Sequence, residues 1–199
     1  MSFLSFPSLA EQNNKEEIVR LLQNGADVNE QNSNGYTALY CDSQFNRTEL
    51  VEILLKHKKI NVNLQNNGDG HSPFWVACRN NSYECVSLML QDPRVDINLA
   101  DDLGWSPLIW SCYEGYTKIV QLLISFGRNI DILKKSTEDY YGIKSGSTAL
   151  DVTKQRNKTA VVQLLQQYQN NPKETQKLWR NELNLKGKNK KYKNNMKKK

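Results

Sequence analysis

A pattern of glycine, hydroxyl and apolar residues recurs four times along the chain. The four copies read GYTAL, GHSPF, GWSPL and GSTAL, and they begin at Gly35, Gly70, Gly104 and Gly146. Their hydroxyl residues follow one another at separations of 35, 34 and 42 residues, at Thr37, Ser72, Ser106 and Thr148. A period of about 34 residues is typical of proteins built as a row of similar units, each of which buries its apolar face against its neighbours.

Each unit carries the signals of two short helices. The hydroxyl residue is suited to cap the first helix, and Pro73 and Pro107 are suited to its first turn. An apolar pair such as Ile119 with Val120 begins about 13 residues later and indicates a second helix. The first helix must end abruptly so that the second folds back against it. At that point the sequence places residues that tolerate a left-handed backbone, namely Asn14, Asn46, Asn81, Gly115 and Asn157.

Three segments, NGADVN at Asn24–Asn29, GYTAL at Gly35–Leu39 and GWSPL at Gly104–Leu108, resemble ankyrin repeats. That family has a Gly-x-Thr-Pro-Leu-His turn, two antiparallel helices and a closing Gly-Ala-Asp-Val-Asn segment. The resemblance covers residues 4–169 and implies an all-α ankyrin-repeat α-solenoid, in which helix-turn-helix pairs carry β-hairpin fingers. Five units including the end caps are expected at residues 4–30, 31–64, 65–99, 100–133 and 145–169, within a domain of residues 1–170.

The sequence departs from the family pattern in its turns and in one loop. The turn histidine is replaced in every copy, by Tyr40, Trp75, Ile109 and Asp151. The pairs Asp42–Ser43 and Thr153–Lys154 stand where the family has two alanines, so we expect the second and fifth units to be the weakest. Residues 134–144 lengthen one finger loop. They form either a loose loop or an extension of a binding face through Tyr140 and Tyr141.

Aromatic residues are concentrated in the segment from Gly104 to Gly127. We expect Trp110 in the core, because it falls where the family has a buried leucine. Tyr116 is expected to be half-exposed at the start of a second helix, and Trp105 and Tyr113 are expected to lie outside.

Stacked repeats of this family present a concave surface, formed by the fingers and the first helices, on which a partner binds. Tyrosine, tryptophan and arginine most often dominate binding energy at such surfaces. The residues predicted to contact a partner are Tyr36, Tyr40, Phe45, His71, Trp75, Arg79, Trp105, Tyr113, Tyr140 and Tyr141. For Tyr40 and Trp75, packing between adjacent units is an equally good explanation.

The charge of the chain is very unevenly distributed. Residues 1–171 carry 16 basic and 19 acidic side chains, a net of −3, whereas residues 172–199 carry 11 basic and 2 acidic side chains, a net of +9. Residues 171–185 have apolar side chains at helical spacing, which predicts a helix that either caps the repeats or docks elsewhere. Residues 186–199 have no apolar period and are expected to form a disordered tail. Its lysines suit a polyanion: Lys186, Lys188, Lys190, Lys191, Lys193, Lys197, Lys198 and Lys199.

Motifs for catalysis, cofactors or metals are not found in the sequence. GIKSGST at Gly142–Thr148 lacks the Gly-Lys-Ser/Thr order of a phosphate loop, and the glycines at Gly68 and Gly70 lack the third glycine of a dinucleotide site. The four cysteines and two histidines show no metal-ligand spacing, so the cysteines are interpreted as core residues. We therefore expect no enzyme activity and no cofactor.

The sequence also indicates the cellular environment. The apolar start of the chain is too short for a secretory signal, and no run approaches the length of a membrane span. We expect an intracellular protein, cytoplasmic or nuclear, with reduced thiols. The resemblance implies a noncatalytic module that binds another protein, as a monomer or as a subunit of a hetero-complex. The alternative is that the basic tail anchors the chain to RNA, DNA or an acidic tubulin-like tail, with the repeats as a scaffold.

Overall fold

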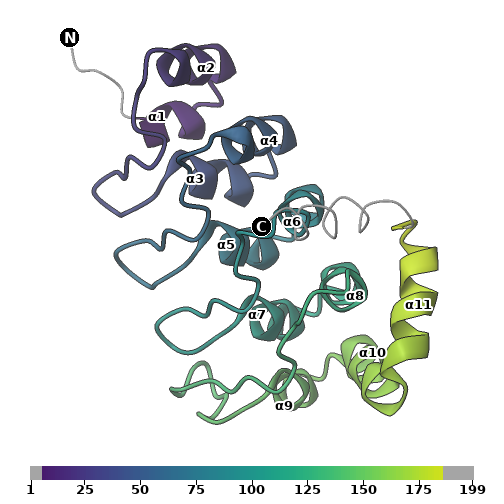
Figure 1. The fold of residues 1–199 in the computed structure, drawn as a ribbon. Helices are drawn as coiled ribbons and strands as arrows, with labels where there is room; N and C mark the ends of the chain where they lie inside the picture. The colour runs from purple at the N-terminus through teal and green to yellow at the C-terminus, as the bar shows by residue number, and fades with distance from the viewer. Residues whose placement is uncertain (1–5, 186–199) are drawn as a thin grey trace.

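The repeated segments fold into pairs of short helices that stack side by side (Figure 1). The structure is a computed structural model, and it describes residues 6–185 of the chain. The first helices of the pairs are α1 (Phe6–Glu11), α3 (Ala38–Gln44), α5 (Pro73–Arg79), α7 (Pro107–Glu114) and α9 (Ala149–Gln155). The second helices are α2 (Lys15–Gln23), α4 (Thr48–Lys56), α6 (Tyr83–Met89), α8 (Thr117–Ser125) and α10 (Thr159–Asn170). A last helix, α11 (Pro172–Glu182), follows α10 directly.

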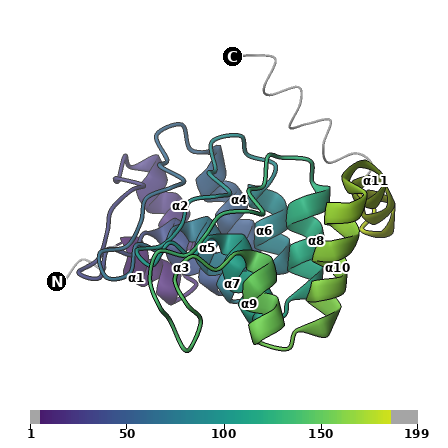
Figure 2. The same cartoon turned by 90° about the horizontal axis from the view of Figure 1, so that it is seen from below.

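The first helices form one layer and the second helices form another (Figures 1 and 2). Along the first layer each helix contacts the next, from α1 to α9, and α4, α6, α8 and α10 do the same along the second layer. The loops between units project from the first layer and lie beside one another (Figure 1). This arrangement confirms the predicted all-α solenoid. The β-hairpin prediction is wrong in detail, because residues 6–185 contain no regular strand and only an isolated bridge between Tyr140 and Ile143.

Hydroxyl side chains cap the first helices as predicted. The Tyr40 N–H donates to Thr37 Oγ1 at 3.1 Å at the start of α3. Ser72 caps α5 and Ser106 caps α7 in the same way, each at 3.2 Å. Thr148 caps α9 within a capping box that Asp151 completes. Each cap satisfies a backbone N–H that has no partner within its helix and contributes about 1 kcal/mol.

The backbone adopts left-handed geometry between the two helices of each pair. The predicted positions with φ values between 54° and 85° are Asn46, Asn81, Gly115 and Asn157. In the first unit the prediction is wrong, because Asn13 rather than Asn14 has a positive φ, of 57°. Asn14 is instead the N-cap of α2, and its Oδ1 accepts a hydrogen bond from the Glu17 N–H at 3.1 Å. The single-residue shift moves Asn14 from the turn to the helix start, where its side chain is equally well suited.

Asparagine side chains connect each unit to the next. Asn29, Asn63 and Asn98 occupy equivalent positions near the ends of successive units. Asn63 Nδ2 donates to Arg94 O at 2.8 Å, and the Asp96 N–H donates to Asn63 Oδ1 at 2.8 Å. Asn29 and Asn98 make the same two bonds with the units that follow them. These amides join neighbouring units although the turn histidine of the expected pattern is absent from every copy.

Asp42 places a carboxyl group inside the second unit. Its side chain is fully buried in α3, and Arg47 Nη1 lies 3.4 Å from Oδ1. Oδ2 accepts no hydrogen bond from the described residues. Burial raises the pKa of Asp42 to about 7, and the charge of Arg47 opposes this shift. At the equivalent position of the fifth unit, Thr153 is also buried but donates its hydroxyl to Leu150 O at 2.8 Å. The buried Asp42 side chain therefore has fewer of its hydrogen bonds satisfied than the buried Thr153 side chain.

Helix α11 folds back onto the second-helix layer. It contacts α8 and α10, and its Trp179 is buried (Figures 1 and 2). Gln176 Nε2 donates to Ile124 O at 3.1 Å, and Arg180 Nε donates to Ser125 O at 2.6 Å. Both acceptors lie at the C-terminal end of α8, where carbonyl groups lack partners within the helix. Of the two alternatives for residues 171–185, the structure thus shows a helix that packs on the repeats. It does so across α8 and α10.

Replacing the buried carboxyl group tests its energetic cost. We expect Asp42→Asn to raise the free energy of unfolding by about 1–3 kcal/mol at pH 8, because it removes a buried charge with an unpaired oxygen. The folded-state pKa is raised to about 7 from the ordinary value of 3.8, so the wild type loses stability as pH rises between these values. The advantage of Asp42→Asn should therefore shrink at pH 4–5. Urea unfolding at both pH values measures it.

The exposed Glu52 of α4 supplies the matched control, because Glu52→Gln removes the same charge from the surface of the same unit. We expect it to change stability by about 0.5 kcal/mol or less at either pH. An Asp42→Asn variant no more stable than the wild type at pH 8 would contradict this description of Asp42.

The packing of α11 is tested by two neighbouring residues on the same helix. Trp179→Ala should lower the free energy of unfolding by about 3–5 kcal/mol, because it leaves a cavity beneath α11. Leu178→Ala should cost far less, since Leu178 is exposed. Urea denaturation of both variants measures the difference, and equal effects would mean that α11 does not pack on α8 and α10 in solution.

Candidate binding face

The ten side chains predicted to contact a partner divide into an accessible and a buried set. Tyr36 and Tyr140 are half-buried, and Phe45, Arg79 and Tyr141 are exposed. The buried members are Tyr40, His71, Trp75, Trp105 and Tyr113. All ten belong to the fingers, to the first helices or their ends, or to the insertion loop. We call the surface that these segments form the binding face. The lysines of the predicted tail lie outside the described residues.

The prediction that Trp105 lies outside is wrong. Its side chain is 0% exposed. Rings of α7 and of the insertion loop cover it, with centroid distances of 5.4 Å to Trp110, 5.3 Å to Tyr113 and 5.1 Å to Tyr140. Below it, Trp75 Nε1 donates a hydrogen bond to Trp105 O at 2.8 Å. The repeat pattern leaves this finger position open, but the insertion loop of this chain covers it.

The prediction that Tyr113 lies outside is also wrong. Its side chain is 9% exposed. It stacks on Trp110 at a centroid distance of 5.4 Å, and the Arg156 guanidinium of the following unit lies 4.4 Å above its ring. Tyr113 is therefore enclosed between its own unit and the next. The prediction of a buried Trp110 is confirmed, and Tyr116 is half-buried as expected.

Tyr40 and Trp75 are both buried, but only Trp75 contacts a ring of the adjacent unit, whereas Tyr40 packs on the finger of its own unit. Tyr40 stacks on Tyr36 at 4.5 Å, and Trp75 contacts Trp110 at 5.2 Å. These contacts connect α3 with its finger and α5 with α7. The indole N–H groups of Trp105 and Trp110 are buried and have no acceptor among the described residues. The aromatic cluster of Trp75, Trp105, Trp110, Tyr113 and Tyr140 thus draws on two first helices, a finger and the insertion loop.

His71 lies flat on the ring of Trp75. The two ring centroids are 3.6 Å apart and the planes differ by 7°. Burial lowers the pKa of His71 to about 4, although the nearby Asp69 and Asp102 carboxylates act in the opposite direction. Nδ1 lies 3.9 Å from Asp69 Oδ2, and Nε2 lies 3.8 Å from Asp101 Oδ2. The imidazole is consequently neutral near pH 7 and acts as a flat polar surface.

Asp101 organises the finger above His71. Its Oδ1 accepts hydrogen bonds from the backbone N–H of Leu103 at 3.1 Å and of Trp105 at 2.7 Å. The side chain is only 3% exposed. Burial raises the pKa of Asp101 to about 6, while the two backbone bonds act to lower it. The carboxylate is therefore mostly ionised at pH 7, and its hydrogen bonds hold the turn of the finger.

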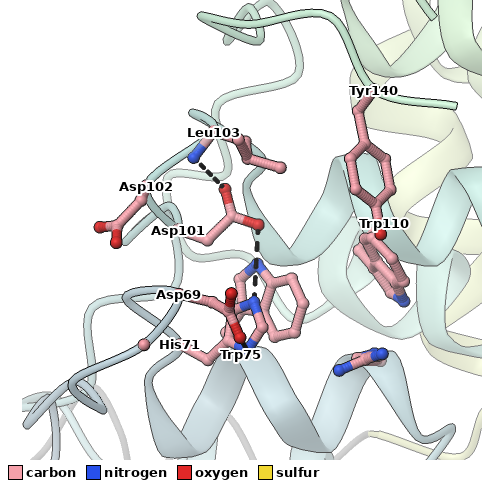
Figure 3. A pocket seen from close by; sticks show the side chains of 10 residues that line it. Asp69, His71, Trp75, Asp101, Asp102, Leu103, Trp110 and Tyr140 are labelled. Carbon is pink, nitrogen blue, oxygen red and sulfur yellow. Dashed lines mark hydrogen bonds and ion pairs between the residues drawn. The ribbon is translucent and has the colours of Figure 1, made fainter. Parts of the chain in front are cut away.

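These residues surround a pocket of about 250 Å³ on the binding face (Figure 3). One side consists of Asp69, Asp101 and the stacked pair of His71 and Trp75, while Trp110 and Tyr140 form the opposite side (Figure 3). Other lining residues are Gly68, Arg79, Asp102 and Leu103. The fingers of two neighbouring units, two first helices and the insertion loop thus all contribute to one pocket.

The insertion loop is ordered by backbone bonds to its own unit and to the preceding finger. Thr137 N–H donates to Leu103 O at 2.9 Å, and Ser136 and Ser147 join the two ends of the loop. Tyr140 packs on the aromatic cluster, whereas Tyr141 is 75% exposed and has a positive φ of 44°. The loop is thus held against the repeats by backbone bonds, and Tyr141 is exposed on it.

Sequence reasoning missed part of this site. It did not identify Arg156, which follows α9 and covers Tyr113. The sequence did indicate Arg156, because it stands eight residues after its capping hydroxyl. Phe45, Asn80 and Glu114 occupy the same position in the other units. Asp69 and Leu103 were also missed as pocket residues, since neither residue type marks a pocket without knowledge of the neighbouring finger.

Other kinds of site were sought among residues 6–185. No group of three or more His, Cys, Asp or Glu side chains in this part of the chain is placed to hold a metal ion. The four cysteines are buried as free thiols, and burial raises the pKa of Cys85 to about 12. No helix in these residues is long and apolar enough to cross a membrane.

Comparison with models of known protein families gave a match to this chain. A family model described as ankyrin repeats (3 copies) matches residues 8–101 and again residues 93–177. The two matches overlap and together extend from within α1 to the first half of α11. The search of curated proteins found no match.

The protonation of His71 tests the geometry of the pocket. NMR titration of its ring protons should give a midpoint near pH 4, because burial against Trp75 disfavours the charged form. Asp69→Asn should lower this midpoint further, since the Asp69 carboxylate favours the protonated ring. A midpoint near the ordinary value of 6.5 would show that His71 is solvated and the stacked arrangement absent.

Proposed function

The chain belongs to the ankyrin-repeat family, whose repeats are generally protein–protein interaction modules, and on this premise we propose that it binds another protein without catalysis. The site of contact is the binding face. Buried rings beneath this face fix its shape, and the exposed side chains above them meet the partner. Of the predicted contact residues, this assignment leaves out Trp105 and Tyr113, which are buried, and keeps Phe45, Tyr141 and Arg79, which are exposed.

The observation that carries the proposal is the exposure of large apolar side chains on this face. Phe45 directly after α3 is 54% exposed, and Tyr141 in the insertion loop is 75% exposed. The other exposed large hydrophobic side chains of residues 6–185 are Leu133 and Leu178. Rings of this size are costly to leave in water and contribute large contact areas when a partner covers them.

Arginine side chains lie over several aromatic rings of this face, most of them buried. The Arg79 guanidinium lies over the rings of Trp75 and Trp110, at 5.8 and 5.1 Å from the centroids. Arg156 lies over Tyr113, and Arg47 lies 4.8 Å from the centroid of Phe45. Stacking on an aromatic ring restricts each guanidinium, so less conformational entropy is lost when a partner binds to it.

The basic tail supports a second candidate function. Residues 172–199 have a net charge of +9, whereas the rest of the chain is slightly acidic. Such a segment suits an electrostatic contact with nucleic acid or another polyanion, with the repeats as a scaffold. The two functions assign partner binding to different parts of the chain, so the same capture experiment separates them.

Affinity capture from the source cell tests the proposal. We expect the intact chain to retain a partner that Phe45→Ala/Tyr141→Ala binds about tenfold or more weakly, because two exposed rings are lost from the contact. Leu178→Ala is the matched control, since it removes an exposed apolar side chain from α11 on the second-helix side, and it should retain the partner.

A third variant, lacking residues 186–199, distinguishes the alternative function. Retention of the partner by this variant supports binding through the repeats. Loss of the partner on truncation, together with full retention by Phe45→Ala/Tyr141→Ala, would contradict the proposal and assign the contact to the tail.

A further inference from the structure

The pocket on the binding face combines aromatic walls with an excess of carboxylates. Its rings are those of Trp75, Trp110 and Tyr140. The carboxylates of Asp69, Asp101 and Asp102 and the single guanidinium of Arg79 also line it, so three negative charges and one positive charge leave a formal net of −2. His71 adds no charge near pH 7, because burial keeps its imidazole neutral. The local field therefore favours a cation over an anion.

One carboxylate oxygen of this pocket lacks a hydrogen-bond donor. Asp101 is almost entirely buried, and both of its backbone hydrogen bonds go to Oδ1. Oδ2 accepts no hydrogen bond from the described residues, and His71 Nε2 lies 3.8 Å from it, which is too long for a hydrogen bond. Figure 3 shows this oxygen on the side of the pocket that faces His71 and Asp69. Oδ2 does not belong to the enclosed polar atoms that lack a partner, so it is accessible to a donor from outside, and a charged donor stabilises it most strongly.

The aromatic walls are also suited to a cation. Arg79 already places a guanidinium over Trp75 and Trp110, which shows that these ring faces hold a positive group in this molecule. Arg79 is exposed and lies at the end of α5, whereas Tyr140 closes the other end of the pocket from the insertion loop. A second cation between Tyr140 and Asp101 would face an aromatic ring on one side and a carboxylate on the other.

The size of the pocket limits what it holds. Its volume of about 250 Å³ is below the range of about 300–1,000 Å³ for pockets that hold drug-sized molecules. It lies on the face assigned to partner binding, next to Tyr141. A single long side chain of a bound protein segment matches this volume and position.

We propose that the pocket receives a lysine or arginine side chain from the docking segment of the partner protein, with its cationic group between Asp69, Asp101 and the ring of Tyr140. This inference rests on the proposed function and adds the chemistry that the partner must supply. The partner's segment is thus basic at the position that meets the pocket, in keeping with the slightly acidic charge of the repeats.

Two capped amino acids that differ only in charge test the proposal on the full chain. The probes are Nα-acetyl-lysine-N-methylamide and the norleucine analogue, which lacks the amino group. We expect the lysine probe to shift the indole N–H signals of Trp75 and Trp110 in NMR spectra saturably and to bind about fivefold more tightly than norleucine. Equal affinity of the two probes, or preference for the corresponding glutamate probe, would overturn the proposal.

Substitutions of pocket residues test whether the lysine probe binds in this pocket. Asp69→Asn should weaken lysine binding about threefold, since Asp69 is exposed, and it should leave the fold intact. Asp101→Asn keeps an oxygen for the two backbone bonds and should weaken binding about tenfold. Glu52→Gln on α4 is the control for a change of net charge and should leave the affinity unchanged. Insensitivity to both aspartate variants would overturn the assignment to this pocket.

The chain's own basic tail is the other candidate occupant. A variant of residues 1–185 that binds the lysine probe, beside an intact chain that does not, would assign the pocket to the tail and overturn the proposal of a partner side chain. Failure of this inference is distinguishable from failure of the proposed function. If no probe binds but Phe45→Ala/Tyr141→Ala still loses the captured partner, the pocket inference is overturned while protein binding by the face stands.

Discussion

The binding face depends on one contact between two neighbouring units. The indole N–H of Trp75, on α5, donates to the backbone carbonyl of Trp105, in the next finger, at 2.8 Å, and both side chains are buried. A buried donor of this kind must keep its acceptor, because leaving it unpaired costs about 1–3 kcal/mol. The bond therefore holds the finger of one unit over the helix of the unit before it. His71 stacks on the same Trp75 ring, so the floor of the pocket follows from the same contact.

The insertion loop adds further packing to the rings beside this contact. Tyr140 covers Trp105 and Trp110, and the Thr137 N–H bonds to the preceding finger at Leu103 O. The result is a face on which most large rings are buried, while Phe45 and Tyr141 are its exposed aromatic side chains among residues 6–185. Two buried indole N–H groups without acceptors among the described residues show that this packing carries an energetic cost.

Much of the fold follows from local sequence signals, whereas the burial of individual rings does not. The capping hydroxyls and the left-handed asparagines were predictable, because each acts within a few residues of its position. The shift from Asn14 to Asn13 shows the ordinary uncertainty of such boundaries. Trp105 and Tyr113 were assigned to the outside because a single unit leaves them open. Rings of their own unit cover them in part, and Tyr140 of the insertion loop and Arg156 of the next unit add to this cover. The position of an inserted loop cannot be derived from the repeat pattern.

The central claim is that Trp105 and Tyr113 form the base of the binding face while Phe45 and Tyr141 form its exposed part. Hydroxyl-radical footprinting of the isolated full chain, read by mass spectrometry, measures the accessibility of all four side chains at once. The structure predicts strong oxidation of Phe45 and Tyr141, little at Tyr113 and essentially none at Trp105, although tryptophan is intrinsically the more reactive ring. Oxidation of Trp105 as rapid as that of Tyr141 would contradict this description.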